Sequence, residues 1–297
     1  MGLEMNSAVM KKTMYFFAIP ALLFYLTFWI FPILKLFQYS VTDYNGYAQA
    51  FNYIGLDNYK DLFHGSTLGT SIWNTLLYTV ISVVAGNLIG LGLALLLNMN
   101  IRGKGFYRSI SYIPTLFSAI VVGFIWSYVY MPDNGMIATL FDKLGIPNDN
   151  LNFLGSYSSA LYSIIFVEIW KNVGTTMIIF LAGLQTVPTD LLEAGRMDGC
   201  GAWRLLRFVK LPLLATAITI NTTLSLINGL KAFDFPFIMT NGGPGTSTNT
   251  LIYSIYKMAF TEQLFGKASA LGIISFFIII VITAVAVLAM NKKEVSA

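Results

Sequence analysis

Cysteine and histidine are almost absent from this sequence of 297 residues, which contains one of each, Cys200 and His64. A single cysteine excludes an internal disulfide and a cysteine-based metal cluster, so we expect no metal site. The sequence also lacks the HExxH and Gly-x-Ser-x-Gly patterns, and no second histidine is available to build a conventional catalytic triad. An enzyme is therefore the least favoured functional class.

Charged residues are also scarce. They make up 11% of the sequence, against 56% hydrophobic residues, whereas a soluble domain carries about 25% charged residues. Most of the chain is therefore expected to face lipid rather than water. The net charge of +4 does not indicate a nucleic-acid partner, because the basic residues lie at the edges of the hydrophobic segments.

Six hydrophobic segments are long enough to cross a membrane, which requires roughly 20 mostly apolar residues. By residue number they are about 15–34, 72–97, 111–130, 160–184, 213–230 and 268–290. We therefore predict an all-α polytopic membrane protein with six transmembrane helices in a single transmembrane domain, residues 1–297.

Lysine and arginine are divided unevenly between the two sides of these segments. All the arginines lie on one side, together with Lys11, Lys12 and the lysines at 292 and 293. Because loops rich in lysine and arginine stay in the cytoplasm, both termini are predicted to be cytoplasmic.

Between the fourth and fifth segments lies a charged loop, residues 185–212. Pro188 suits a helix start, and Asp190 complements the positive end of that helix. Gly199 and the glycine at 201 permit a sharp turn, and Pro212 fits the first turn of the next span. The pattern predicts two short helices around a glycine break. Such a protrusion suits docking into a partner's groove, and an amphipathic helix lying on lipid headgroups is the alternative.

The same loop carries a resemblance to a known family. Glu193-Ala194-Gly195, then Gly199, Val209 and Leu211-Pro212 resemble the EAA-x3-G-x9-I-x-LP loop of binding-protein-dependent permeases of ABC importers. Gly195 replaces the second alanine and Val209 replaces isoleucine. Gly195 weakens a helix by roughly 1 kcal/mol relative to alanine.

Further segments resemble the carbohydrate branch of that family, and the Thr-x-Gly-Gly-Pro element is similar to the F-type subunit of the maltose importer. These segments are Ile54–Tyr59, Asn74-Thr75, Ala182–Leu184, Phe233-Asp234, Thr240–Pro244 and Phe265–Ala270. The resemblance implies the type I ABC importer permease fold in the cytoplasmic membrane of a bacterium or archaeon.

The resemblance also implies a set of partners. They are a second, G-type permease subunit, two cytoplasmic ATPase subunits that use ATP and Mg, an extracytoplasmic solute-binding protein, a sugar and membrane lipid. The sequence has no GxxxxGK[ST] phosphate loop, so this chain itself is expected to bind no cofactor. The helix Thr189–Met197 would dock into the ATPase. The residues expected to carry that coupling are Glu193, Ala194, Gly195, Asp198, Gly199, Leu211 and Pro212.

Charged residues inside a span are functional candidates because they are costly there. Glu168 and Lys171 lie three residues apart on one face of the fourth segment. They either neutralise each other or face a wet cavity, and Trp170 either stacks on a sugar ring or packs between helices. Alignment with the maltose importer implies that Glu168, Lys171, Asn172, Thr175, Ser225 and Gly229 line the solute. The charges depart from the neutral maltose site.

Several interpretations remain open at this stage. The permease could serve a non-sugar solute such as a glycerol phosphate, and an ion-driven carrier is less favoured because neither inverted repeats nor interrupted helices are evident. Asn221 and Asn228 are candidates for hydrogen bonds between helices. Phe233, Asp234 and Thr240 are expected to shape an outer gate or to contact the binding protein.

Overall fold

The computed structural model describes residues 7–146 and 151–294, which are helical apart from loops and one isolated bridge between Thr42 and Tyr53. The expected all-α fold is confirmed over these residues. The chain termini, expected to be cytoplasmic, lie outside them. The chain forms two compact units, Met1–His64 with Ile255–Ile274, and Gly65–Ser254 with Ser275–Ala297.

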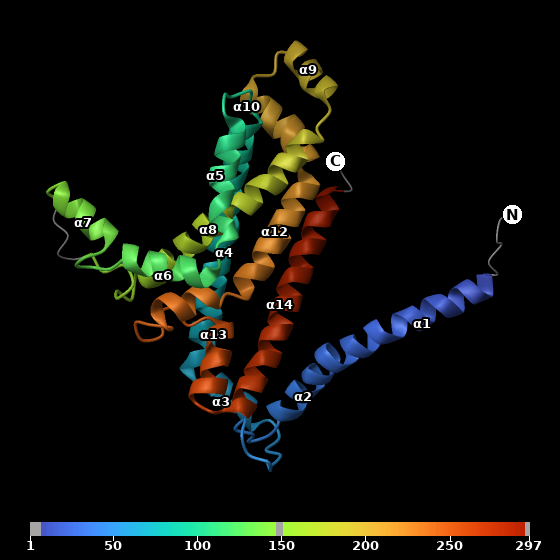
Figure 1. Cartoon of the computed structure of the whole chain (residues 1–297), viewed down its shortest axis with the longest axis vertical. Helices are drawn as coiled ribbons and strands as arrows, with labels where there is room; N and C mark the ends of the chain where they lie inside the picture. The colour runs from blue at the N-terminus through green and yellow to red at the C-terminus, as the bar shows by residue number, and fades with distance from the viewer. Residues whose placement is uncertain (1–6, 147–150, 295–297) are drawn as a thin grey trace. The chain divides into compact units, whose positions relative to one another are not determined.

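The first unit begins with a long helical path that includes the expected span 15–34 (Figure 1). The path consists of α1 (Ser7–Tyr25), a π-helical turn η1 (Leu26–Ile30) and α2 (Phe31–Ser40). It continues to Ser40, where the side chain of Asn58 in α3 (Asp57–His64) hydrogen-bonds the carbonyls at the end of α2. The Asn58 Nδ2 atom donates to the carbonyl oxygens of Ser40 and Thr42, at 2.9 Å and 2.8 Å.

The loop after α2 is closed by side chains of the same unit. The backbone N–H of Asn52 donates to the Asp43 carboxylate at 2.7 Å, and this bond lowers the pKa of Asp43 below its ordinary value. Gly266 N–H donates to the Tyr44 carbonyl at 2.7 Å. A Cβ at Gly266 would meet the Thr42 carbonyl oxygen, so only glycine allows this approach.

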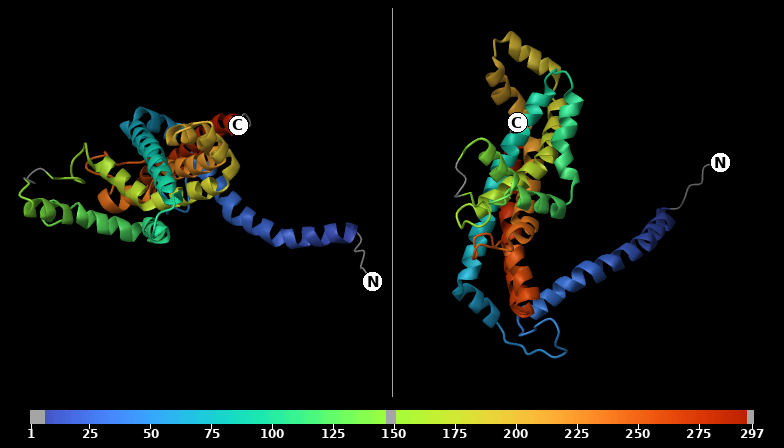
Figure 2. Two further views of the ribbon diagram at one scale, coloured as in Figure 1. Left: turned by 90° about the horizontal axis from the view of Figure 1, so that it is seen from above. Right: turned by 60° about the vertical axis from the view of Figure 1, so that its left-hand side comes forward.

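The second unit is built around α4 (Ser66–Asn98) and α8 (Ala160–Gln185), which pack along each other. The helices α5 (Lys104–Leu116) and α12 (Ala215–Leu230) pack against them (Figures 1 and 2). Small residues allow close approach, as is usual between membrane helices. A Cβ at Gly174 of α8 would meet the backbone oxygen of Ser111.

The third expected span, 111–130, is not one straight helix. The helices α5 and α6 (Ala119–Val129) meet at an angle of 98°. Phe117 between them is extended, with φ −78° and ψ 146°. The Ser118 hydroxyl caps the start of α6 by accepting from the backbone N–H of Val121 at 3.3 Å. The apolar run at 111–130 therefore contains the end of α5 and the start of α6.

The fifth expected span, 213–230, is also part of a bent pair of helices and not one straight helix. A helical path formed by α10 (Ala202–Leu205), the π-helical turn η2 (Leu206–Lys210) and α11 (Leu211–Leu213) meets α12 at 71°. The bend falls at Leu214, which is fully buried. Pro212 thus lies in the helical path before the bend, and not at the first turn of the span.

The remaining expected spans are each a single helix, α4, α8 and α14 (Phe265–Glu294). In the described chain, four helices are long and apolar enough to cross a membrane, or up to six if each bent pair forms one span. The other helical elements are α7 (Met136–Lys143), α9 (Thr189–Met197), η3 (Pro236–Thr240), α13 (Leu251–Tyr256) and η4 (Lys257–Thr261).

Candidate functional site

The second unit contains a polar cavity of about 240 Å³ between α4, α8 and the segment that follows α12. Three of the predicted solute residues, Glu168, Lys171 and Asn172, line it. The full lining is Tyr78, Ala119, Glu168, Lys171, Asn172, Asn228, Lys231, Ala232, Phe233, Asp234 and Phe235. The charges predicted within the fourth span therefore do face a hollow.

Glu168 is the centre of the polar contacts in this cavity. Its carboxylate is hydrogen-bonded by the hydroxyl of Tyr78, a fully buried residue of α4. The Asn172 Nδ2 atom donates to the backbone carbonyl of Glu168 at 3.2 Å. The Tyr78 contact joins the Glu168 carboxylate to α4, whereas the Asn172 bond lies within α8. Tyr78 is a residue that the sequence analysis missed.

The charges in the cavity do not form direct ion pairs. In the described part of the chain, salt bridges within 4.0 Å join only Lys60 to Asp57, Lys257 to Glu262 and Lys267 to Asp61. Glu168 and Lys171 therefore do not neutralise each other by contact. Lys231 and Asp234 add one charge of each sign to the lining, so the cavity presents equal numbers of cations and anions.

The wall that contains Lys231 and Asp234 is anchored from the polar loop that follows it. The Thr250 hydroxyl donates to the carbonyl of Ala232 at 2.7 Å. The Asn74 Nδ2 atom of α4 donates to the carbonyls of Thr246 and Asn249, at 2.9 Å and 3.0 Å. Phe233 and Asp234, expected at an outer gate, thus line the cavity itself.

Thr240, also expected at the gate, is bonded within the same loop. Its hydroxyl lies 2.8 Å from that of Thr248 and donates to the Pro236 carbonyl at 3.0 Å. Of the other polar helix positions, Asn221 does bond between helices, because its Nδ2 atom donates to the Thr176 carbonyl at 3.1 Å. Asn228 instead lines the cavity.

A smaller cavity of about 40 Å³ adjoins the first and shares Glu168, Asn172 and Asn228 with it. Ser225, predicted to line the solute, belongs to this smaller cavity. So does Thr176, whereas the predicted Thr175 lines neither cavity. Neighbouring residues on a helix with 3.6 residues per turn are rotated by about 100°, so Thr175 and Thr176 lie on different faces of α8.

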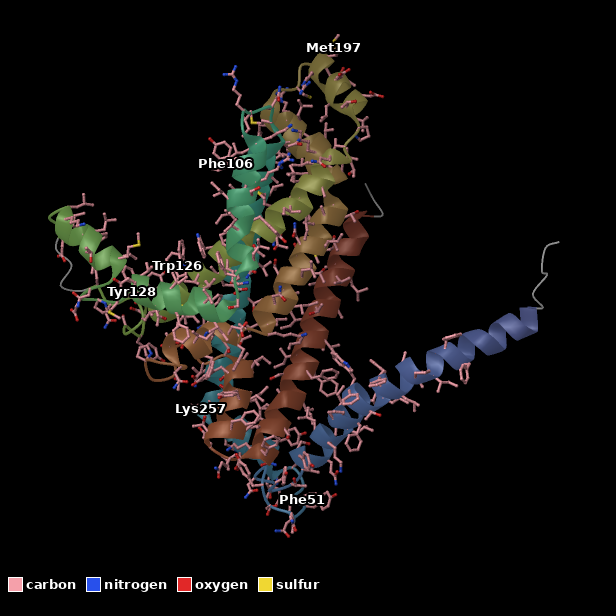
Figure 3. The ribbon with its side chains drawn as sticks, in the orientation of Figure 1. Phe51, Phe106, Trp126, Tyr128, Met197 and Lys257 are labelled. Atoms are coloured by element: carbon pink, nitrogen blue, oxygen red, sulfur yellow. The ribbon has the colours of Figure 1, made fainter. Side chains whose placement is uncertain are left out.

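Two further predicted residues have packing partners instead of a place in the cavity lining. The Trp170 ring lies edge-to-face against Trp126 of α6, with centroids 5.4 Å apart. Figure 3 shows Trp126 projecting from α6. A Cβ at Gly229 would lie 2.9 Å from the Cα of Thr79, so Gly229 is required by the contact between α12 and α4.

The predicted coupling segment forms a separate feature at one end of the second unit, where α9 protrudes (Figure 1). Its bounds, Thr189–Met197, are those expected from the sequence, and none of its residues is buried. Met197 is 88% exposed and lies at the tip in Figure 3. Glu193 and Ala194 are not buried either. The helix therefore has no buried face in this chain.

The end of α9 has a complete glycine cap. Gly199 has φ +77°, and its N–H donates to the carbonyl of Arg196 at 3.0 Å. The N–H of Cys200 donates to the carbonyl of Gly195 at 2.9 Å. These are the two bonds of a Schellman motif, in which glycine adopts the left-handed conformation. Asp198 is the last residue before this glycine.

The cap folds α9 back toward the path that contains Leu211 and Pro212. A Cβ at Gly195 would lie 2.7 Å from the Cδ2 atom of Leu205 and 3.9 Å from the Cγ2 atom of Val209. Leu205 is buried. The glycine that replaces alanine in the motif thus makes room for a neighbouring leucine.

Comparison with known proteins agrees with this architecture. Residues 86–293 match the family described as "Binding-protein-dependent transport system inner membrane component". A probable ABC transporter permease protein of Pyrococcus horikoshii is 35% identical over 266 residues, which cover 90% of this chain and 91% of that protein. A probable starch degradation products transport system permease protein of Thermoanaerobacterium thermosulfurigenes is 33% identical over 281 residues, 94% of each chain.

Solved structures show the same fold. The chain superposes with a TM-score of 0.84 on a chain of a bacterial alginate ABC transporter crystallised with a pentasaccharide-bound periplasmic protein. The match covers 97% of both chains at 21% sequence identity. The predicted type I permease fold is confirmed, and the chain belongs to the family of inner membrane components of binding-protein-dependent transport systems.

Proposed function

We propose that this chain is a transmembrane permease subunit of an ATP-driven, binding-protein-dependent importer for a sugar. The observation that carries the proposal is the cavity of the second unit, whose lining combines Glu168, Lys171, Lys231 and Asp234 without direct ion pairs. Charged groups inside a membrane span are retained where they serve a solute pathway.

The balance of donors and acceptors favours a sugar. Carboxylates accept hydrogen bonds and ammonium groups donate them, and a sugar hydroxyl does both. The similarity to a starch-products permease supports this class. A glycerol phosphate is the alternative, because Lys171 and Lys231 both face the cavity. The two nearby carboxylates oppose an anion, so the sugar is preferred.

The coupling helix supports the ATP-driven mechanism. The sequence has no phosphate loop, so a separate ATPase would hydrolyse ATP with Mg. We assign α9 to the cleft of that ATPase, because none of its residues is buried. Glu193 and Ala194 would contact the partner, whereas Gly195, Gly199 and Pro212 would set the shape of the segment. Family membership favours this mechanism over an ion-driven carrier.

The remaining components of the proposal follow from the family. A second, G-type permease subunit would complete the pathway, two ATPase subunits would lie in the cytoplasm and a solute-binding protein would deliver the sugar from outside. The alginate transporter was crystallised with such a periplasmic protein. The distribution of lysine and arginine favours a cytoplasmic location for α9 and both termini, in a bacterial or archaeal membrane.

Uptake by the complete transporter in proteoliposomes tests the proposal. Maltopentaose and glycerol 3-phosphate would be offered separately, with ATP inside and with the proton gradient collapsed. Glu168→Gln and Lys171→Met should each lower kcat/KM for the transported solute by about tenfold or more, since a hydrogen bond to a charged group contributes about 1.5–3 kcal/mol. Lys143→Met and Glu262→Gln, which change exposed charges outside the cavity, should leave uptake unchanged.

Each result has a defined meaning. ATP-dependent uptake of maltopentaose alone supports the sugar, and uptake of glycerol 3-phosphate alone supports the alternative. Normal uptake and selectivity in both Glu168→Gln and Lys171→Met would refute the proposed solute cavity. Uptake that stops on loss of the proton gradient, with ATP still present, would refute the ATP-driven mechanism.

A further inference from the structure

Glu168 and Lys171 stay apart although their positions on α8 favour a contact. Residues three apart on a helix are neighbours, and opposite charges attract each other more strongly inside a membrane span than in water. In the described chain, however, no salt bridge within 4.0 Å joins the two side chains. Another group in the cavity must therefore compete with Lys171 for the Glu168 carboxylate.

The competing group is the hydroxyl of Tyr78. It hydrogen-bonds the Glu168 carboxylate from α4, and among the described residues it is the one hydrogen-bond partner of that carboxylate that comes from another helix. The other partner, Asn172, lies on α8 itself. Because α4 and α8 pack along each other, the Tyr78 bond draws the carboxylate toward α4.

The Tyr78 side chain is fixed by its surroundings. It is 2% exposed and belongs to a hydrophobic cluster with Leu161 and Ile164 of α8, and it also lines the charged cavity. Tyrosine suits this place because it combines an apolar ring with one polar tip. Nearby on α4, the Thr75 hydroxyl accepts from the backbone N–H of Leu251 at 2.9 Å. The helix that presents the Tyr78 hydroxyl is therefore anchored as well.

The charge of Asp234 makes such a restraint necessary. Asp234 lines the same cavity and lies close enough to Glu168 for the two negative charges to interact. Repulsion by Asp234 and attraction by Lys171 both favour an ion pair between Glu168 and Lys171. The hydrogen bond from Tyr78 opposes that pairing.

We propose that Tyr78 is a positioning residue that keeps the solute site open. By holding the Glu168 carboxylate toward α4, it leaves one carboxylate oxygen and the Lys171 ammonium group free to bind the solute. The inference rests on the proposed import function, in which both groups contact the solute. Without the Tyr78 hydroxyl, Glu168 and Lys171 would pair with each other, and the solute would have to break that pair in order to bind.

Tyr78→Phe tests this role because it removes the hydroxyl and retains the ring. The kcat/KM for ATP-dependent uptake of the transported solute, maltopentaose or glycerol 3-phosphate, should fall about tenfold, the effect of losing one hydrogen bond to a charged group. The complete transporter in proteoliposomes is the material.

Tyr130→Phe is the matched control. Tyr130 is buried in the same hydrophobic cluster, and its hydroxyl also donates to α8, to the backbone carbonyl of Ser163 at 3.4 Å. It does not line the charged cavity, so Tyr130→Phe should keep the wild-type kcat/KM. An equal loss in the two tyrosine variants would show that the effect comes from packing, and the proposal would fail.

Double variants show whether Tyr78 acts through the two charges. When Lys171→Met is already present, Glu168 has no neighbour to pair with, so adding Tyr78→Phe should lower kcat/KM by less than about twofold. The same small effect is expected when Tyr78→Phe is added to Glu168→Gln. A full tenfold loss in either background would contradict the positioning role.

Cryo-electron microscopy of the complete transporter in lipid nanodiscs, without solute, tests the geometry independently of uptake. In Tyr78→Phe the Glu168 carboxylate and the Lys171 ammonium group should approach within about 4 Å, the limit for an ion pair. They should stay apart in the wild type and in Tyr130→Phe. Separate groups in Tyr78→Phe would overturn the proposal. If the pair forms in Tyr78→Phe but the wild type takes up neither solute with ATP, the proposed transport function fails and the positioning role of Tyr78 stands.

Discussion

The side chain of Leu205 occupies the space that a Cβ at Gly195 would need, because such a Cβ would lie only 2.7 Å from the Leu205 Cδ2 atom. The contact joins α9 to the helical path that leads into the membrane. It gives a physical reason for glycine at a motif position where the family pattern has alanine.

Substitution of Gly195 should therefore disturb coupling more than solute binding. We expect Gly195→Val to lower ATP-driven uptake about tenfold or more, because the branched side chain displaces Leu205 and tilts α9. Uptake and ATP hydrolysis should be measured together in proteoliposomes. Leu205→Ala combined with Gly195→Val should recover part of the loss, and additive losses in this double-mutant cycle would contradict the direct contact.

The glycine cap of α9 leads to a second prediction. Gly199→Pro should abolish uptake while membrane insertion is retained, because proline cannot adopt φ +77° and lacks the N–H that donates to Arg196. Gly201→Ala is the matched control, since Gly201 has φ −67° and a Cβ there has no neighbour within 4 Å. Transport that survives in Gly199→Pro would argue against a coupling role for the cap.

The packing of α8 against α5 leads to a third prediction. Gly174→Ala should destabilise the protein by about 1–3 kcal/mol, the usual cost of overpacking, because the added methyl group meets the backbone of Ser111 and Tyr112. The temperature of unfolding in detergent is the measurement. Gly92→Ala, at a position with open space, should leave that temperature unchanged or raise it. Equal behaviour of the two variants would show that α5 and α8 are not in close contact.

A fourth prediction concerns the loop that anchors the cavity wall. Asn74→Ala should lower stability by more than about 1 kcal/mol, because two loop carbonyls lose their donor. Asn87→Ala on the same helix is the control, since the Asn87 Nδ2 atom bonds only the Val83 carbonyl within α4 and its buried Oδ1 atom is unpaired. Thermal unfolding of both variants is the test. A loss of stability in Asn87→Ala as large as that in Asn74→Ala would contradict the anchoring role.

The sequence predicted the helices better than it predicted their directions. The bounds of α9 were predictable because Pro188, Asp190 and Gly199 mark its two ends. The bends at Phe117 and Leu214 were missed because hydropathy averaged over a window records apolar length and not orientation. Ser118 before an apolar run is an N-cap signal that indicates the first bend, and Pro212, two residues before Leu214, is a kink signal for the second.

Residues of the candidate site could be predicted from the sequence where a charged side chain lies within a hydrophobic span. Glu168 and Lys171 were identified because charge is costly within a span. Tyr78 was overlooked because tyrosine is common in apolar segments, and its contact with Glu168 joins helices distant in sequence. Lys231 and Asp234 lie after the end of α12, where charge is ordinary, and only the fold brings them to the cavity.

The bend at Leu214 gives the second unit a fixed pivot. Leu214 is fully buried in a cluster with Met177 and Phe180 of α8, so the corner between α11 and α12 is held while the segments on either side extend away from it. The 16 residues of α12 span about 24 Å. Rotation of that arm by about 10° would displace its far end, beside Lys231, by about 4 Å. A small tilt at this corner is therefore enough to move a charged wall of the cavity by more than the length of a hydrogen bond.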